Sequence, residues 1–187
     1  MELLASPLAE CRWCKLLGEA EPNRFEPTKN PTWSIEILLD NGNKEHESFI
    51  GSLEKLFLEE HGKSAKKSNN WLACGPDKED PEKTVVKFKV PCFTRKNGTK
   101  SQGPVVFDSQ REHWPSSKLI GNGSKVIIAF DIYAWKGPSG AGITLQPKMM
   151  QVIELVEYSG GDSPEVDAVF EKIQGGYPLK DDPEVPF

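Results

Sequence analysis

Two aromatic residues have the spacing of a binding surface. Tyr133 and Trp135 lie two positions apart in a run that alternates like a β-strand, so both rings point to the same face. Phe130 and Ile132 belong to the opposite, core-facing side. Rings outside a core can stack on nucleic-acid bases, at about 1–3 kcal/mol per base whatever the sequence. The sequence leaves open the alternative that a loop covers both rings as a small satellite core.

Basic residues accompany this aromatic pair. Between residues 83 and 125, lysines and arginines outnumber acidic residues by seven. Cations of this kind neutralise a phosphate backbone. Phe93 is a candidate third stacking ring, and the candidate phosphate contacts are Lys87, Lys89, Arg95, Lys96, Lys125 and Lys136.

Residue patterns for catalysis or metal binding are missing. The chain has no phosphate-binding loop, zinc-peptidase or serine-hydrolase motif, so we expect a protein that is not an enzyme. Cys11 and Cys14 have the spacing of half a zinc knuckle, but no second ligand pair completes it. We therefore expect free thiols, no metal and no cofactor.

Length and charge indicate one domain with a separate acidic end. The 187 residues carry a formal net charge of −5, and this length suits one globular core. No apolar run reaches the ~18 residues of a membrane span. The first residues lack the features of a signal peptide, so we expect a cytoplasmic location and no membrane contact.

The last residues form the acidic end. From residue 162 onward there are seven acidic residues against two lysines. We expect a binding domain over 1–158 and, over 159–187, an acidic tail that is mobile or docked on a partner. A basic pocket with an apolar floor would bind this tail, and the protein's own groove is one such pocket; a solvated, frayed end is the alternative. The candidate partner-binding residues are Asp181, Asp182, Glu184 and Phe187.

The periodicity of the chain predicts the elements that position these residues. Strands are expected over 8–20, 32–40, 84–95, 125–136 and 143–158, the last with a bulge near Pro147. Residues 103–109 are expected to pair with 84–95 as a hairpin, because an Asn-Gly turn lies between them. One helix is expected over about 46–61, between the second and third strands. This set suits a mainly β, small closed five-stranded barrel with the helix plugging one end.

Short motifs in a fixed order resemble those of a known family. They lie at residues 17–22, 86–89, 120–126, 133–136, 140–142, 145–146, 152–155 and 160–161, with an acidic end closing on Phe187. The chain resembles the replication single-stranded DNA-binding proteins of short-tailed phages (podoviruses). The resemblance implies an OB-fold and a non-sequence-specific protein that coats and anneals single strands in phage DNA replication, recombination and repair. It also implies a homodimer in the host cytoplasm, and it assigns base stacking to Tyr133 and Trp135.

The resemblance also implies protein partners, while the residues themselves leave two alternative functions open. The tail would recruit the phage DNA polymerase and helicase-primase, and it would compete with DNA for the groove. One rival is an OB-type module that binds an oligosaccharide or a protein without any nucleic-acid role. The other is a small nuclease that uses scattered carboxylates. The positive stretch over 83–125 argues against a neutral ligand.

Overall fold

The computed structural model describes residues 3–158, and this part of the chain is mainly β with one helix. This agrees with the fold class expected from the sequence. The elements are β1 (Leu4–Ala5), β2 (Ala9–Lys15), β3 (Thr32–Asp40), α1 (Lys44–His61), β4 (Cys74–Pro76), β5 (Lys83–Pro91), β6 (Val105–Phe107), β7 (Lys125–Gly137) and β8 (Gly140–Glu154).

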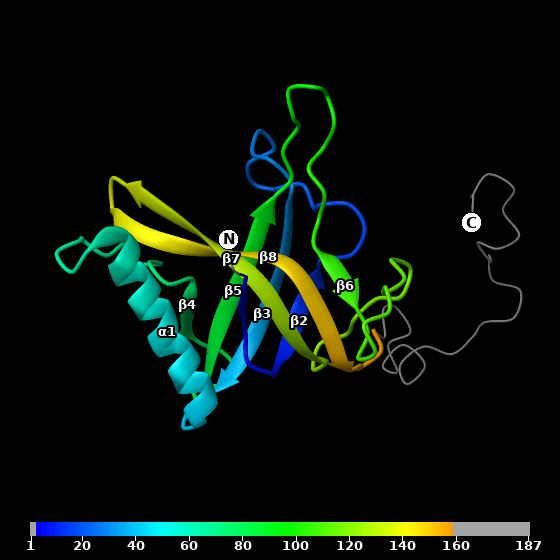
Figure 1. Cartoon of the computed structure of the whole chain (residues 1–187), viewed down its shortest axis with the longest axis horizontal. Helices are drawn as coiled ribbons and strands as arrows, with labels where there is room; N and C mark the ends of the chain where they lie inside the picture. Colours follow the sequence, from blue (N-terminus) through cyan, green and yellow to red (C-terminus); the bar gives the residue numbers. More distant parts are fainter. Residues whose placement is uncertain (1–2, 159–187) are drawn as a thin grey trace, which may run out of the picture.

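Strand pairing closes the sheet on itself (Figure 1). The ring of neighbours is β7-β2-β3-β5-β8, and β8 pairs again with β7. The closure is uneven, because β5 and β8 meet in parallel through the single pair Phe88 and Leu145. The short strands extend this ring: β1 pairs with β7, β4 with β5, and β6 with β8.

Inward side chains of the ring strands form the core. On β3 these are Trp33, Ile35, Ile37 and Leu39, which alternate with less buried residues as the sequence predicts. The rings of Phe88 and Phe130 pack edge to face, with centroids 5.3 Å apart. The core therefore ties β5 to β7 across the barrel.

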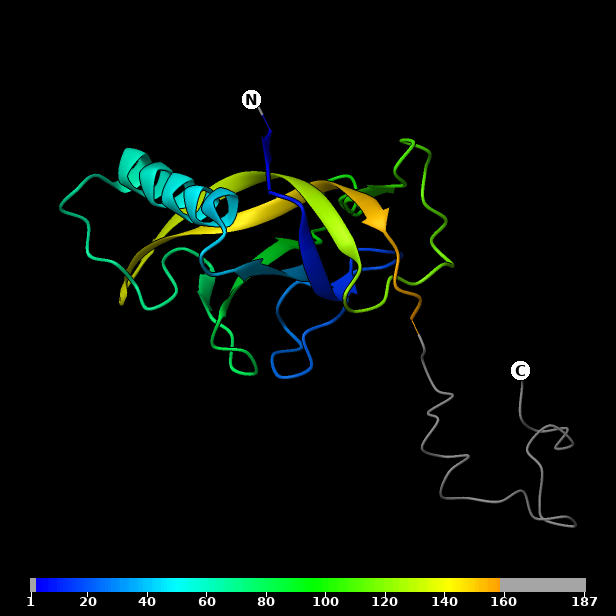
Figure 2. The ribbon, with the colours of Figure 1, turned by 90° about the horizontal axis from the view of Figure 1, so that it is seen from below.

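Helix α1 packs beside the arm formed by β7 and β8 (Figure 2). The Asn43 side chain caps its first turn by accepting from the backbone N–H of Glu45 at 3.0 Å. The helix ends before Gly62, whose φ of 82° suits a residue without a side chain. Its buried stripe includes Phe49, which contacts Phe130, and Phe57, which contacts Trp71.

Two expectations about strand pairing had different outcomes. The bulge expected near Pro147 is confirmed, because the register of β7 and β8 shifts between Ala129 and Phe130, opposite this proline. The hairpin of 84–95 with 103–109 is wrong. The chain pairs across its turn only at Thr94 and Lys100, and β6 runs parallel to β8 instead. Pairing with β8 buries Val106 against the core, which explains why β6 pairs with β8 and not with residues 84–95.

Candidate functional site

A groove of about 700 Å³ lies over the outer face of β2, β3 and β5. The ends of β7 and β8 form one wall, and the segment that contains β4 forms the other. Aromatic and charged side chains line it together, which combines stacking surfaces with ionic ones. The lining residues used below are Arg12, Trp13, Glu36, Ser68, Asn70, Asp77, Lys78, Glu79, Lys87, Lys89 and Trp135; we call this the groove.

Trp135 belongs to the groove wall, and its strand position predicts that its ring points away from the core. Its ring lies over the backbone of Gly142, its partner on β8. A Cβ atom at Gly142 would come within 2.4 Å of Cζ2 of Trp135, so the glycine is what allows the ring to lie there. Trp135 is half-buried and Tyr133 is 58% exposed, so no satellite core seals this pair.

Trp13 is a groove residue that the sequence did not reveal. Strict alternation along β2 would place it beside the buried Cys11, inside the barrel. The register of β2 with β3 shifts between Arg12 and Lys15, and Trp13 has a φ of 52°. It is 56% exposed, and its backbone N–H donates to Oδ1 of Asn122 at 2.9 Å. A strained backbone that presents a large ring to a groove is typical of a functional site.

Carboxylates offset several of the groove cations. Arg12 donates from Nε to Glu36 at 2.8 Å and from its terminal nitrogen to Asp77 at 2.9 Å. Lys87 Nζ lies 3.2 Å from the other oxygen of Glu36. Lys89 makes no salt bridge with any residue in 3–158. On the strand face beneath the groove, Lys89 is therefore a cation that is available to bind an anion.

The ionisation of this network follows from its contacts. Partial burial alone would lower the pKa of Arg12, but hydrogen bonds to Glu36 and Asp77 raise that pKa above the usual arginine value. Burial alone would raise the pKa of Asp77, yet the hydrogen bond and charge of Arg12 hold it below its usual value. Both groups are therefore charged at neutral pH. The Arg12 ion pairs join β2 to β3 and to the segment that contains β4.

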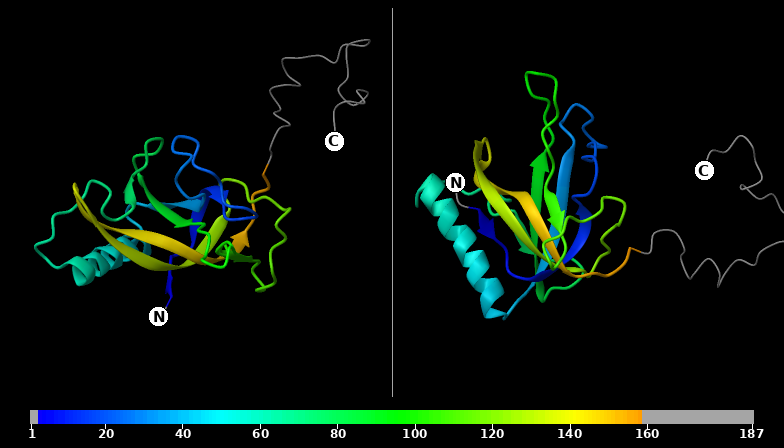
Figure 3. Two further views of the ribbon diagram at one scale, coloured as in Figure 1. Left: turned by 90° about the horizontal axis from the view of Figure 1, so that it is seen from above. Right: turned by 45° about the vertical axis from the view of Figure 1, so that its right-hand side comes forward.

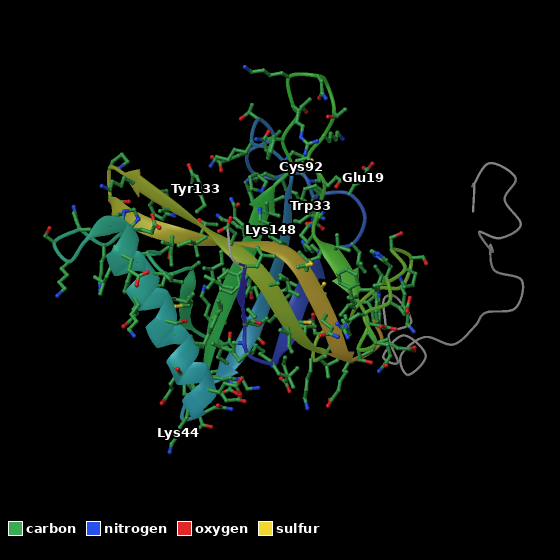
Figure 4. All side chains as sticks on the ribbon, viewed as in Figure 1. Glu19, Trp33, Lys44, Cys92, Tyr133 and Lys148 are labelled. Carbon is green, nitrogen blue, oxygen red and sulfur yellow. The ribbon has the colours of Figure 1, made fainter. Side chains whose placement is uncertain are left out.

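The other candidates predicted from the sequence lie outside the groove. Phe93, which is 48% exposed, belongs with Arg95 and Lys96 to the loop between β5 and β6. This loop projects from the barrel beside the loop between β2 and β3 (Figure 3, right). Figure 4 shows Tyr133 on the β7–β8 arm, apart from Cys92 and Trp33 near the base of these loops.

The two remaining candidate lysines, Lys125 and Lys136, lie at opposite ends of β7. Lys136 is exposed next to the β7–β8 turn. Lys125 lies at the other end of the strand, where its Nζ is 3.1 Å from Glu154. The candidate tail residues Asp181, Asp182, Glu184 and Phe187 lie outside the described residues.

Residues 3–158 contain neither a candidate metal site nor a membrane-spanning helix. No group of three or more histidine, cysteine or acidic side chains there could hold a metal ion. All four cysteines are free thiols. No helix in this range is long and apolar enough to cross a membrane.

We expect Cys11 and Cys14 to react slowly with alkylating agents in the folded protein. Burial, with a smaller contribution from Cys14, raises the pKa of Cys11 to about 12, and burial raises the pKa of Cys14 to about 11. A raised pKa lowers the thiolate fraction, so labelling by iodoacetamide at about pH 8 should be at least about 100-fold slower than in denaturant. Mass spectrometry of timed samples measures this; equal rates in both states would contradict it.

Two curated relatives match part of the chain, and both are single-stranded DNA-binding proteins of phages. Over 91 residues the chain is 30% identical to the single-stranded DNA-binding protein of Escherichia phage T7, covering 45% of this chain and 39% of that protein. Over 85 residues it is 31% identical to the single-stranded DNA-binding protein of Enterobacteria phage T3, covering 42% and 37%. The matched region thus spans about two fifths of these curated relatives. No family model matches the chain.

Two solved structures with a similar fold are also single-stranded DNA-binding proteins of phages. The single-stranded DNA-binding protein encoded by bacteriophage T7 superposes with a TM-score of 0.66 at 17% identity, covering 87% of this chain and 97% of that one. The single-stranded DNA-binding protein of bacteriophage Enc34 in complex with ssDNA gives 0.62 at 17% identity, covering 83% and 88%. These matches confirm the resemblance read from the sequence motifs, and at this identity the structural likeness concerns the fold.

Proposed function

We propose that this chain is a non-enzymatic protein that binds single-stranded DNA without sequence preference in phage DNA replication and recombination, where it coats and anneals strands. The observation that carries the proposal is the groove, in which Trp13 and Trp135 stand beside Lys87 and Lys89. Every base has a flat face that can stack on an aromatic ring, while lysines follow the phosphates. The names of the curated relatives state single-stranded DNA binding, which supports the binding part of this proposal.

We propose that the described domain is a five-stranded OB-fold barrel made of β2, β3, β5, β7 and β8. The closed ring of these strands supports it, as does the parallel contact of β5 with β8. Helix α1 would be the capping element, inserted between the second and third barrel strands. The binding domain would extend over 1–158, with an acidic tail over 159–187.

The groove residues receive separate roles in this proposal. Trp135 and Trp13 stack on bases at the groove, and Tyr133 offers a further ring along the same arm. Lys89 and Lys87 contact phosphates, and Lys136 continues these contacts at the turn. Phe93, Arg95 and Lys96 would contact DNA that passes beyond the end of β5. Lys125 would contact only a strand that reaches the far end of β7.

The direct test is the binding of a fluorescent oligothymidine of about 16 nucleotides, measured by anisotropy at low and at physiological salt. We expect binding that weakens as salt rises, because phosphate contacts release counterions. A competition with heparin and with a neutral oligosaccharide separates DNA binding from the rival OB-type functions. Absence of binding, or binding independent of salt, would overturn the proposal.

The acidic tail is proposed as the partner-binding element. Its residues Asp181, Asp182, Glu184 and Phe187 would recruit the phage DNA polymerase and helicase-primase. The relatives are phage proteins, which supports action in the host cytoplasm on phage DNA, and the resemblance further favours a homodimer there.

Deleting the residues after Gly161 is expected to tighten DNA binding. The tail carries an excess of five negative charges, so it repels phosphates and competes with them for the lysines that line the groove. Anisotropy at low salt compares the full chain with the truncated one, and a pull-down tests polymerase contact, which we expect to be lost. Weaker DNA binding by the truncated chain would reject autoinhibition by the tail.

A further inference from the structure

The loop between α1 and β4 is seated on the turn that joins β7 to β8. Three backbone hydrogen bonds hold it: Ala141 N–H to Lys66 O at 2.7 Å, Ser68 N–H to Ala141 O at 3.0 Å, and Ile143 N–H to Trp71 O at 2.7 Å. The end of α1 joins the same arm, because Nε2 of His61 lies 3.0 Å from the carbonyl oxygen of Gly142. Loop and turn therefore form one unit.

Gly140 makes this close approach possible. A Cβ atom there would lie 2.7 Å from both the carbonyl oxygen of Lys66 and the nitrogen of Ser68. Its φ of 136° is also a conformation that residues with side chains rarely adopt. The turn thus has a glycine where the loop crosses it.

This unit carries four exposed lysines. Lys63, Lys66 and Lys67 come from the loop and Lys136 from β7; we call them the tip lysines. None of them makes a salt bridge with any residue in 3–158. Lys67 Nζ lies 3.7 Å from the centre of the Trp71 ring, a contact that orients the ammonium group without neutralising it.

The groove itself has a different charge balance. Its four cations, Arg12, Lys78, Lys87 and Lys89, face three carboxylates, Glu36, Asp77 and Glu79. Arg12 and Lys87 are both in salt bridges there. The groove is therefore well suited to bases and only weakly suited to several phosphates. The same loop connects the two places, since its residues Ser68 and Asn70 line the groove wall.

We propose that the tip lysines form a second phosphate-binding site, which continues the path of single-stranded DNA from the groove over the β7–β8 turn. This proposal rests on the proposed function. Bases stack at Trp135 and Trp13, and the phosphates of the next nucleotides meet Lys136, Lys66, Lys67 and Lys63. Most of the salt dependence of binding then comes from the tip, and only DNA longer than the groove experiences it.

The test compares two oligothymidines, of about 4 and about 16 nucleotides, which bracket the site sizes of OB-folds. The tip variant is Lys63→Gln with Lys66→Gln and Lys136→Gln; Lys67 stays, because it packs on Trp71. The matched control is Lys44→Gln with Lys55→Gln and Lys118→Gln, which changes the net charge equally at exposed positions outside the groove and the tip. Lys44 lies at the end of α1 away from the β7–β8 turn (Figure 4).

For the long probe, we expect the slope of log K against log salt to fall by about 2 in the tip variant, at about 0.7 per lost phosphate contact. The short probe and the control should keep the wild-type slope. The single variant Lys66→Gln should lower the long-probe slope by about 0.7, and thermal melting checks that each variant is folded.

An unchanged long-probe slope in the tip variant, or an equal fall in the control, would overturn the second site. Failure of the proposed function looks different. In that case the wild-type chain binds neither probe at either salt concentration.

Discussion

Replacing Trp135 by alanine is expected to weaken binding of single-stranded DNA by roughly 5- to 150-fold. The substitution removes a half-buried ring that lines the same groove as Lys87 and Lys89. One stacked base contributes about 1–3 kcal/mol, which corresponds to this range. Anisotropy of a labelled oligothymidine measures the change without interference from tryptophan fluorescence.

The control for this variant is Trp114→Ala. Trp114 is also a half-buried tryptophan, and its indole donates to the carbonyl oxygen of Lys118 at 2.8 Å. It does not line the groove, so its loss should leave DNA affinity unchanged. Thermal melting of both variants separates a lost contact from a lost fold. Equal affinity of Trp135→Ala and wild type would mean that this ring does not stack on DNA.

Gly142→Ala offers an independent check of the same side chain. The added methyl group would collide with the Trp135 ring, whose Cζ2 atom lies 2.4 Å from the position of that Cβ. The ring must then move away from its position over Gly142, while the tryptophan side chain itself is unchanged. Reduced affinity in both variants would show that the position of the ring, and not only its presence, matters.

Strand periodicity was sufficient to predict much of this site. Tyr133 and Trp135 lie where β7 keeps a regular register with β8, and Lys87 and Lys89 alternate with the buried Val86 and Phe88. Their outward faces follow directly from this pattern. The shared groove could not be predicted in the same way, because it depends on which strands are neighbours in the closed ring.

Irregular backbone explains what the sequence missed. Trp13 lies two positions after the buried Cys11, so strict alternation predicts that it points into the core. The bulge in β2 turns it outward. A bulge displaces one residue without a clear signature in the pattern. The lysines at 63, 66 and 67 lie in a polar loop, where no period indicates a neighbour; their proximity to the β7–β8 turn depends on backbone hydrogen bonds to Ala141.

Charge counting overestimated the uniformity of the basic stretch over 83–125. Lys125 and Lys87 are both counted as positive in the sequence, yet each lies next to a carboxylate, Glu154 and Glu36 respectively. These partners are cross-strand neighbours. A net charge read along the chain therefore cannot distinguish a cation that is available to DNA from one that already stabilises the sheet.

Replacing Phe88 by alanine is expected to lower the free energy of unfolding by about 3–5 kcal/mol. Phe88 is fully buried, it packs edge to face on Phe130, and its backbone position is the single pair that joins β5 to β8. The substitution therefore leaves a cavity at the residue pair that joins β5 to β8. Chemical denaturation followed by circular dichroism measures the loss.

The matched control is Tyr133→Ala, which removes an aromatic ring that is 58% exposed on β7 and should change stability by less than about 0.5 kcal/mol. The two variants should also separate in DNA binding. Lys87 and Lys89 flank Phe88 on β5 and point outward, so opening the barrel at Phe88 moves these lysines relative to Trp135. Phe88→Ala should bind DNA less well near its unfolding midpoint and recover affinity under stabilising conditions, whereas a Tyr133→Ala defect should persist.

If Phe88→Ala lowered the free energy of unfolding by less than about 1 kcal/mol, this result would contradict the role of the ring in closing the barrel.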